Sequence, residues 1–273
     1  MKPAEFDLVR AGNIAEATRL LIDADGMARL IAGGQSLAPM LNLRLVQPRL
    51  LIDITGIPEL TRIEDTNDAV IVGGCITTAN VEDRRLPGLG LDDLPSIAGN
   101  IAFRAIRNRG TLGGSLCHAD PAADWISALS AFDAQCMVAG IKGDRLLPIH
   151  EFITGAYETA LVSGEILEAI RIPRLSASGR CGFYKVNRKA GEFASVIGAV
   201  LSDRDRGVFR IVIGAVKARP IVVDDAAKLT NASGAIDTAA LLVLLDNAQV
   251  TNDAKRRQSV AAVLRAHAQA VSS

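Results

Sequence analysis

The first part of the chain shows the apolar spacing of an amphipathic helix. The apolar face of this helix is formed by Ile14, Ala17, Leu21 and Ala24. Asn13 suits the N-cap, Glu16 stands three residues on as in a capping box, and Gly26 follows the predicted end. We therefore predict that a helix opens the structured part of the chain.

Short apolar runs predict β-strands through the next 150 residues, and longer patterns predict helices between them. The predicted strands cover 29–32, 50–54, 70–72, 134–139, 145–149 and 166–172. Helices are predicted from near Ser36, over 92–104 and over 120–132. Asp120 suits the N-cap of the last helix, with Pro121 in its first turn.

The pattern changes after 175–179, a segment rich in Ser and Gly that we predict to be a domain boundary. Strands are predicted over 182–187, 194–201 and 209–215, with a hairpin loop at 203–207 between the last two. Helices complete the chain, including one over 253–271. Strands followed by helices predict a small α+β domain packed on the first.

Two segments combine a Gly-Gly pair with small hydroxyl residues, and in each we predict that an apolar strand leads into the pair. They are 31–36, which contains Gly33 and Gly34, and 111–115, which contains Gly113 and Gly114. Adjacent glycines let backbone N–H groups point at one place, and such a nest can hold phosphate oxygens. A single Gly-Gly pair is more often a plain tight turn. The G-x-G-x-x-G and P-loop patterns are absent, so a Rossmann-type or P-loop site is disfavoured.

The composition excludes several classes of binding partner for this chain. Charged residues make up 22% of the 273 positions with a formal net charge of zero, which argues against a nucleic-acid partner. No apolar stretch has the length of a membrane span, and the N-terminus lacks a signal-type segment, so we expect a cytoplasmic protein. The four cysteines and three histidines are scattered, which predicts neither a metal site nor an iron–sulfur cluster on this chain.

Three groups of residues together resemble the medium, FAD-binding subunit of molybdenum hydroxylases, the family of carbon monoxide, xanthine and nicotine dehydrogenases. The first group is 32–40 with Arg44-Leu45, Pro48 and 51–54. The second is 106–116 followed by 118–124. The third is 165–167, Ile172-Pro173, Tyr184-Lys185, Arg188 and 192–194. These matches occur in the family's order and cover nearly the whole chain.

The resemblance implies an α+β fold of the PCMH, or vanillyl-alcohol-oxidase, type. Two α/β subdomains, about 1–55 and 56–175, would form an FAD-binding domain over 1–175, followed by a C-terminal α+β domain over 176–273. We also predict that FAD is bound noncovalently, because neither glycine segment contains a His or Cys for attachment to the ring.

The resemblance assigns roles in FAD binding by position. Ala32, Gly33, Gly34, Gln35 and Ser36 would line the pyrophosphate together with Thr111, Leu112, Gly113, Gly114 and Ser115, and Leu30, Ile31 and Leu37 would flank the first segment. Asp124 would contact the adenosine portion, and Leu167 and Lys185 would lie near the isoalloxazine. Ile101 stands where xanthine dehydrogenases carry an aromatic residue, which argues against NAD stacking there.

The implied function is that of an oxidoreductase subunit without catalytic acid–base or metal-binding residues of its own. A large partner subunit would carry the molybdenum cofactor and set the substrate, and a small one would carry 2Fe–2S clusters. FAD on this chain would pass electrons to an external acceptor, in a dimer of heterotrimers. A self-contained flavin oxidase and an FAD-free scaffold subunit are the alternatives.

Several of these residues also have plain structural interpretations. Asp124 suits the first turn of a helix, Leu167 suits the core, and Lys185 suits an exposed strand position. Arg107 and Arg109 are either solvated charges of a connector or groups that bind phosphate or a partner, and the sequence favours neither.

Overall fold

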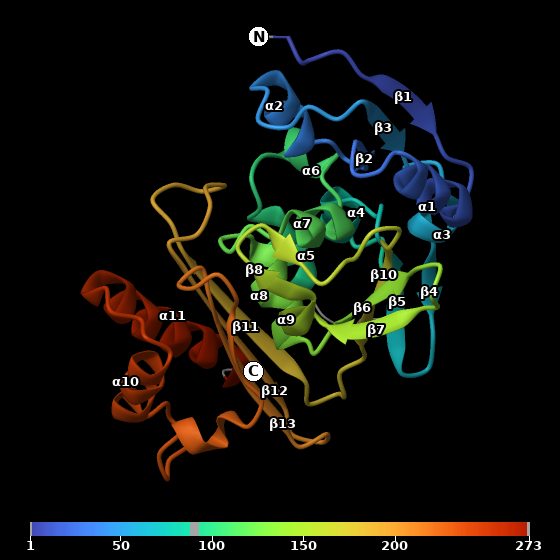
Figure 1. The fold of residues 1–273 in the computed structure, drawn as a ribbon. Coiled ribbons are helices and arrows are strands. Elements are labelled where there is room, and N and C mark those ends of the chain that lie inside the picture. Colours follow the sequence, from blue (N-terminus) through green and yellow to red (C-terminus); the bar gives the residue numbers. More distant parts are fainter. Residues whose placement is uncertain (1, 88–92, 272–273) are drawn as a thin grey trace.

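Three β-sheets of three, five and four strands succeed one another along the chain in the computed structural model, which describes residues 2–87 and 93–271. Figure 1 shows the first sheet at the top right, the second below it and the third at the lower left. The first sheet is parallel, in the order β1 (Asp7–Arg10), β3 (Leu50–Asp53) and β2 (Ala28–Ile31). Its strands confirm the two predicted within the first 55 residues and add β1.

Helix α1 (Ile14–Asp23) joins β1 to β2, and α2 (Leu37–Asn42) joins β2 to β3. The predicted N-cap is confirmed, because Asn13 Oδ1 accepts a hydrogen bond from Glu16 N at 2.8 Å. The reciprocal bond of the capping box is shifted by one residue, since the Glu16 carboxylate accepts from Gly12 N, also at 2.8 Å.

The second sheet is antiparallel, in the order β4-β5-β10-β6-β7. Its strands are β4 (Ile63–Asp65), β5 (Ala69–Gly73), β6 (Gln135–Ala139), β7 (Arg145–Pro148) and β10 (Ile166–Pro173). The helices of this region are α3 (Pro58–Thr61), α4 (Thr78–Glu82), α5 (Asp93–Gly99), α6 (Arg104–Arg107), α7 (Leu112–His118), α8 (Asp124–Ala131) and α9 (Ile149–Phe152). Every residue of α8 is buried, so this helix is the centre of the molecule.

The single helix predicted over 92–104 is wrong. Asp92 lies outside the described residues, α5 ends at Gly99, and α6 begins at Arg104. Between them, Ile101 forms an isolated β-bridge with Gly191, and Ala102 has a positive φ of 45°. A left-handed residue and a long-range pairing both interrupt the helical hydrogen bonds.

The predicted start of the next helix at Asp120 is also wrong. Helix α8 begins at Asp124, with Ala123 at the N-cap position. Asp120 instead closes a tight turn before the helix, because its Oδ1 accepts from Ala122 N at 2.9 Å and its carbonyl accepts from Ala123 N at 2.9 Å. Asp-Pro favours both a helix start and a turn, and here the side chain stabilises the turn.

The third sheet is an antiparallel meander of β11 (Arg180–Val186), β12 (Val196–Asp203), β13 (Val208–Gly214) and β14 (Ile221–Val223). The 3-10 helix η1 (Ala226–Leu229), α10 (Thr238–Asn247) and α11 (Asp253–Val271) follow, while β8 (Ile153–Gly155) and β9 (Glu158–Thr159) pair separately before β10. The three strands predicted after the boundary are confirmed.

Strand β12 is buried on both faces, which explains its unbroken apolar sequence. Val196 and Val200 face α11, where they pack with Ala262 and its neighbours. Ala199 faces the other way and packs on Ala131 of α8. The third sheet is therefore held against the preceding part of the chain through α8, while α10 and α11 cover its outer face (Figure 1).

Candidate functional site

The first glycine segment leaves β2 with its backbone N–H groups free. Gly34 has a φ of +72°, a left-handed conformation that favours glycine. Within residues 2–87 and 93–271, the backbone N–H groups of 33–36 find no hydrogen-bond acceptor. The segment is half-buried, with only Gln35 exposed. Adjacent free N–H groups of this kind form a nest that suits phosphate oxygens.

The second glycine segment is built differently, and the strand predicted before it is wrong. Thr111 makes only an isolated bridge to Thr77 and then caps α7, its Oγ1 accepting from Gly114 N at 2.9 Å. The N–H groups of Leu112 and Gly113 donate to the carbonyls of Ile76 and Gly74, both at 3.0 Å. Ser115 N donates to Thr111 O at 3.0 Å.

The second segment therefore lacks the free N–H groups that its sequence suggests. All four N–H groups of 112–115 are already bonded within the protein. What the segment presents outward is the exposed Gly114 and the half-buried Ser115, a surface without a Cβ beside a hydroxyl group. Such a surface lets a ligand approach closely, but it offers the ligand no free backbone N–H donors.

Glycine packing brings the first segment against residues 109 and 110, which directly precede the second segment, although Gly33 and Gly110 are 77 positions apart. A Cβ on Gly33 would lie 1.9 Å from the carbonyl oxygen of Arg109, so only glycine permits this contact. A Cβ on Gly110 would lie 3.8 Å from Cγ of Gln35. The two motifs therefore share one surface, as the prediction of a common ligand requires.

A third Gly-Gly pair, Gly73-Gly74, belongs to this arrangement and was missed in the sequence. Gly73 ends β5 and Gly74 follows it, at the same strand end where Gly33-Gly34 stands after β2. A Cβ on Gly113 would lie 2.6 Å from Gly74 O, and one on Gly74 would lie 2.7 Å from Leu167 O. The signal was available, since a glycine pair after the apolar run 69–72 is the same pattern. Its role is to seat α7 against the second sheet.

The remaining predicted residues of these segments have mixed burial. Leu167 is 5% exposed and belongs to the main hydrophobic core, beside the Gly74–Gly113 contact. Leu30 and Ala32 pack on the core of the first sheet. Ile31, Ser36 and Leu37 are half-buried around the loop.

Asp124 and Lys185 form a buried ion pair. Lys185 Nζ lies 3.0 Å from Asp124 Oδ1 and 3.1 Å from Oδ2, and the two side chains are 7% and 5% exposed. The same ammonium donates to the carbonyl of Asn100 at 3.0 Å, immediately before Ile101. Burial raises the pKa of Asp124, and the charge of Lys185 opposes that shift. The interpretation of Lys185 as an exposed strand residue is therefore wrong.

The two arginines of the connector differ in role. Arg107 is buried and binds Glu82 through two hydrogen bonds of 2.8 Å, while its Nη1 donates to the carbonyls of Ile101 and Ala102 at 2.9 and 3.2 Å. It therefore holds the break between α5 and α6, which is neither of the two roles considered for it. Arg109 is exposed beside Gly33, and both of its roles stay open.

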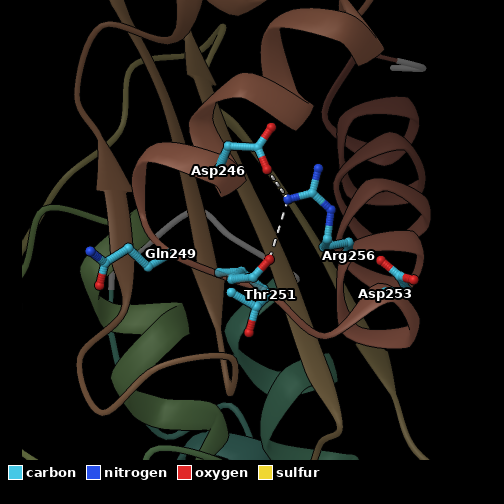
Figure 2. A pocket seen from close by; sticks show the side chains of 6 residues that line it. Asp246, Gln249, Thr251, Asp253 and Arg256 are labelled. Carbon is cyan, nitrogen blue, oxygen red and sulfur yellow. Dashed lines mark hydrogen bonds and ion pairs between the residues drawn. The ribbon is translucent and has the colours of Figure 1, made fainter.

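A cavity of about 330 Å³ lies elsewhere, between the end of α10 and the start of α11. It is lined by Asp246, Gln249, Val250, Thr251, Asp253 and Arg256. Figure 2 shows the Arg256 side chain reaching across the space to Asp246, with which it pairs, and to the carbonyl of Val250. None of the predicted site residues lines this cavity, so the glycine segments are the candidate site.

Comparison with known proteins identifies the family of this chain. Residues 4–175 match the family model described as the FAD binding domain in molybdopterin dehydrogenase. The chain belongs to this family. Within it, the 6-hydroxypseudooxynicotine dehydrogenase complex subunit alpha of Paenarthrobacter nicotinovorans is 36% identical over 71% of this chain and 66% of its own length. The caffeine dehydrogenase subunit beta of Pseudomonas sp. (strain CBB1) is 35% identical over 81% and 76%.

Solved structures of two oxidoreductases match nearly the whole chain. A chain of carbon monoxide dehydrogenase from Hydrogenophaga pseudoflava superposes with a TM-score of 0.88 at 30% identity, covering 100% of this chain and 99% of that one. A chain of quinoline 2-oxidoreductase from Pseudomonas putida 86 gives a TM-score of 0.87 at 30% identity, covering 99% and 98%. These similarities confirm the predicted α+β fold of the PCMH type.

This chain is thus an FAD-binding flavoprotein of the molybdopterin dehydrogenase family, and its site fits that cofactor. The observation that supports the fit is the set of free N–H groups at 33–36, which a diphosphate would satisfy. Every helix among residues 2–87 and 93–271 is too short or too polar to cross a lipid bilayer.

Proposed function

We propose that this chain is the medium subunit of a molybdenum hydroxylase complex and passes electrons through FAD to an external acceptor. Membership of the family and whole-chain similarity to carbon monoxide dehydrogenase and quinoline 2-oxidoreductase support this role. The 2Fe–2S clusters would lie on a small partner subunit and the molybdenum cofactor on a large one. The assembly would be a dimer of heterotrimers in the cytoplasm.

The observation that carries the proposal is the free backbone of the first glycine segment. The N–H groups of 33–36 would hold the FAD diphosphate, with Gly34 supplying the left-handed turn that aims them. The segment 111–115 would form the opposite wall through Gly114 and Ser115. When bound, FAD would accept electrons from the one-electron clusters and pass them to an acceptor. The chain's own residues would bind and orient it.

Residues away from the diphosphate would shape the rest of the FAD site. The proposed set around the first segment is Leu30, Ile31, Ala32, Gln35 and Leu37. The set beyond the second segment is Ile101, Thr111, Leu112, Gly113, Asp124, Leu167 and Lys185. A scaffold subunit without FAD is disfavoured, because it has no use for unpaired backbone donors that cost free energy when they are shielded from water.

Purification of the native complex through a tag on this chain tests the proposal. We expect stoichiometric flavin with molybdenum and iron on co-purifying chains, and flavin alone on the isolated chain. Absence of flavin would support the scaffold alternative. Flavin without molybdenum or iron, in material that still oxidises an organic substrate, would support a self-contained flavin oxidase.

A further inference from the structure

Helix α6 is attached to the end of α4 by arginine and carboxylate side chains. Arg107 Nε and Nη2 donate to the two carboxylate oxygens of Glu82, both at 2.8 Å. Arg104 donates to the two carboxylate oxygens of Asp83 at 2.7 and 2.8 Å, and also to Glu82 at 2.8 Å. Paired hydrogen bonds of this kind fix the orientation of both groups. Because a helix of four residues has little stability of its own, these bonds hold α6 in place.

The end of α6 in turn carries the two residues against which the first glycine segment packs. Arg109 N and Gly110 N both donate to the carbonyl of Ile106, at 3.1 and 2.7 Å. A Cβ on Gly33 would lie 1.9 Å from Arg109 O and 3.0 Å from Cα of Gly110, so the two backbones are in close contact. The position of α6 therefore determines where Gly33 lies.

The start of α4 holds the second glycine segment. Thr78 N donates to Gly110 O at 2.8 Å, and Thr77 forms an isolated bridge with Thr111. Thr78 Oγ1 also accepts a hydrogen bond of 3.2 Å from Trp125 Nε1, which belongs to the buried helix α8. Helix α4 therefore fixes the second segment at its start and, through α6, the first segment at its end.

Glu82 is the carboxylate that both arginines share. It accepts hydrogen bonds from Arg107 and from Arg104, whereas Asp83 accepts from Arg104. The side chains of Arg107 and Glu82 are 10% and 22% exposed, so this pair is largely shielded from water. Removing the negative charge of Glu82 would leave the guanidinium of Arg107 shielded without compensation. The attachment of α6 therefore depends most on Glu82.

We propose that Glu82 is a positioning residue for the FAD site. Through Arg107 and Arg104 it fixes 109–110, and so fixes the direction of the free N–H groups of 33–36. This inference rests on the proposed FAD site, although the attachment of α6 itself requires no cofactor. A backbone nest holds phosphate oxygens only when its N–H groups point at one place. A side chain that supports the nest from behind can therefore change FAD affinity without touching FAD.

Two measurements on the full chain test the proposal. Backbone amide chemical shifts of 33–36 are recorded by NMR without FAD, and the FAD dissociation constant is measured by flavin fluorescence. The variants are Glu82→Gln, Arg104→Gln as a milder change, and Asp203→Asn as a control for lost stability. Asp203 is fully buried and accepts from Ser176 N at 2.9 Å, and Ser176 lies outside both glycine segments.

We expect Glu82→Gln to shift the amide resonances of 33–36 and to weaken FAD binding about tenfold, the factor that corresponds to one hydrogen bond to a charged group. Arg104→Gln leaves the pair of Arg107 and Glu82 in place, so it should cause the same changes at a smaller size. Asp203→Asn should lower the melting temperature of the chain, because it removes a buried charge, but leave the amide shifts of 33–36 and the FAD affinity as in wild type.

Unchanged amide resonances in Glu82→Gln would overturn the inference, as would an FAD affinity equal to that of wild type. Equal changes in Asp203→Asn would overturn it as well, because they would reflect a general loss of stability. If Glu82→Gln fails to fold, Arg104→Gln decides by the same two measurements. Failure of wild type to bind FAD, with amide shifts that still respond to Glu82→Gln, would instead refute the proposed FAD site while confirming that Glu82 fixes the first glycine segment.

Discussion

Replacing Gly33 by alanine tests whether packing of the first glycine segment against Arg109, just before the second segment, creates the FAD site. The new Cβ would lie 1.9 Å from Arg109 O, whereas ordinary contact begins at 3.4 Å, so the segments must separate by about 1.5 Å. Hydrogen bonds lengthened by that amount are lost. Two charge-assisted bonds contribute about 3–6 kcal/mol, so FAD should bind at least ~100-fold more weakly.

A matched control is available in Gly26. It has a φ of +80°, and no atom lies within 4 Å of the position that a Cβ would take, so Gly26→Ala costs only backbone strain of about 1–2 kcal/mol. Equilibrium dialysis of FAD against each folded variant, checked by circular dichroism, measures the difference. Wild-type FAD affinity in Gly33→Ala would refute the reasoning, and so would an equal loss in Gly26→Ala.

Three further outcomes are expected. Gly114→Val should abolish FAD binding while most of the fold remains, because its Cβ would crowd Thr111 Oγ1 at 2.7 Å and occupy the open face; retained flavin would show that this wall is not part of the site. Acid precipitation should release all flavin, and a yellow pellet would show a covalent link. Glu82→Gln should lower the melting temperature by about 5 °C at pH 7. Hydrogen bonds from Arg107 lower the pKa of Glu82, so this contribution is fully present above about pH 4.3 and decreases as pH falls through the lowered pKa, and a Tm difference that does not shrink between pH 7 and pH 3 would contradict it.

Local signals were sufficient for most elements of the fold. Signals within a few residues of each other predicted the helix cap at Asn13. The same holds for the apolar runs that form β2, β3, β6 and β10. The first glycine segment was also interpreted correctly as a loop after a strand. The family resemblance then supplied the fold type, which periodicity alone does not specify.

Long-range contacts explain what the sequence did not show. The two Gly-Gly pairs look alike, yet the N–H groups of 112 and 113 are bonded to 76 and 74, residues nearly forty positions earlier. Burial of Arg107 depends on Glu82, and that of Lys185 depends on Asp124, 61 residues away. A charged residue in a single sequence looks solvated until its partner is known.

Anaerobic reduction of the flavin tests the central claim most directly. The isolated chain, loaded with FAD, is mixed with a substrate of the whole complex, and flavin absorbance near its visible maximum is followed with and without the cluster-bearing and molybdenum-bearing chains. We expect the flavin to stay oxidised alone and to bleach when those chains are added, because electrons reach it only through the clusters. Rapid bleaching of the isolated chain by substrate would contradict the account and identify a self-contained flavin oxidase.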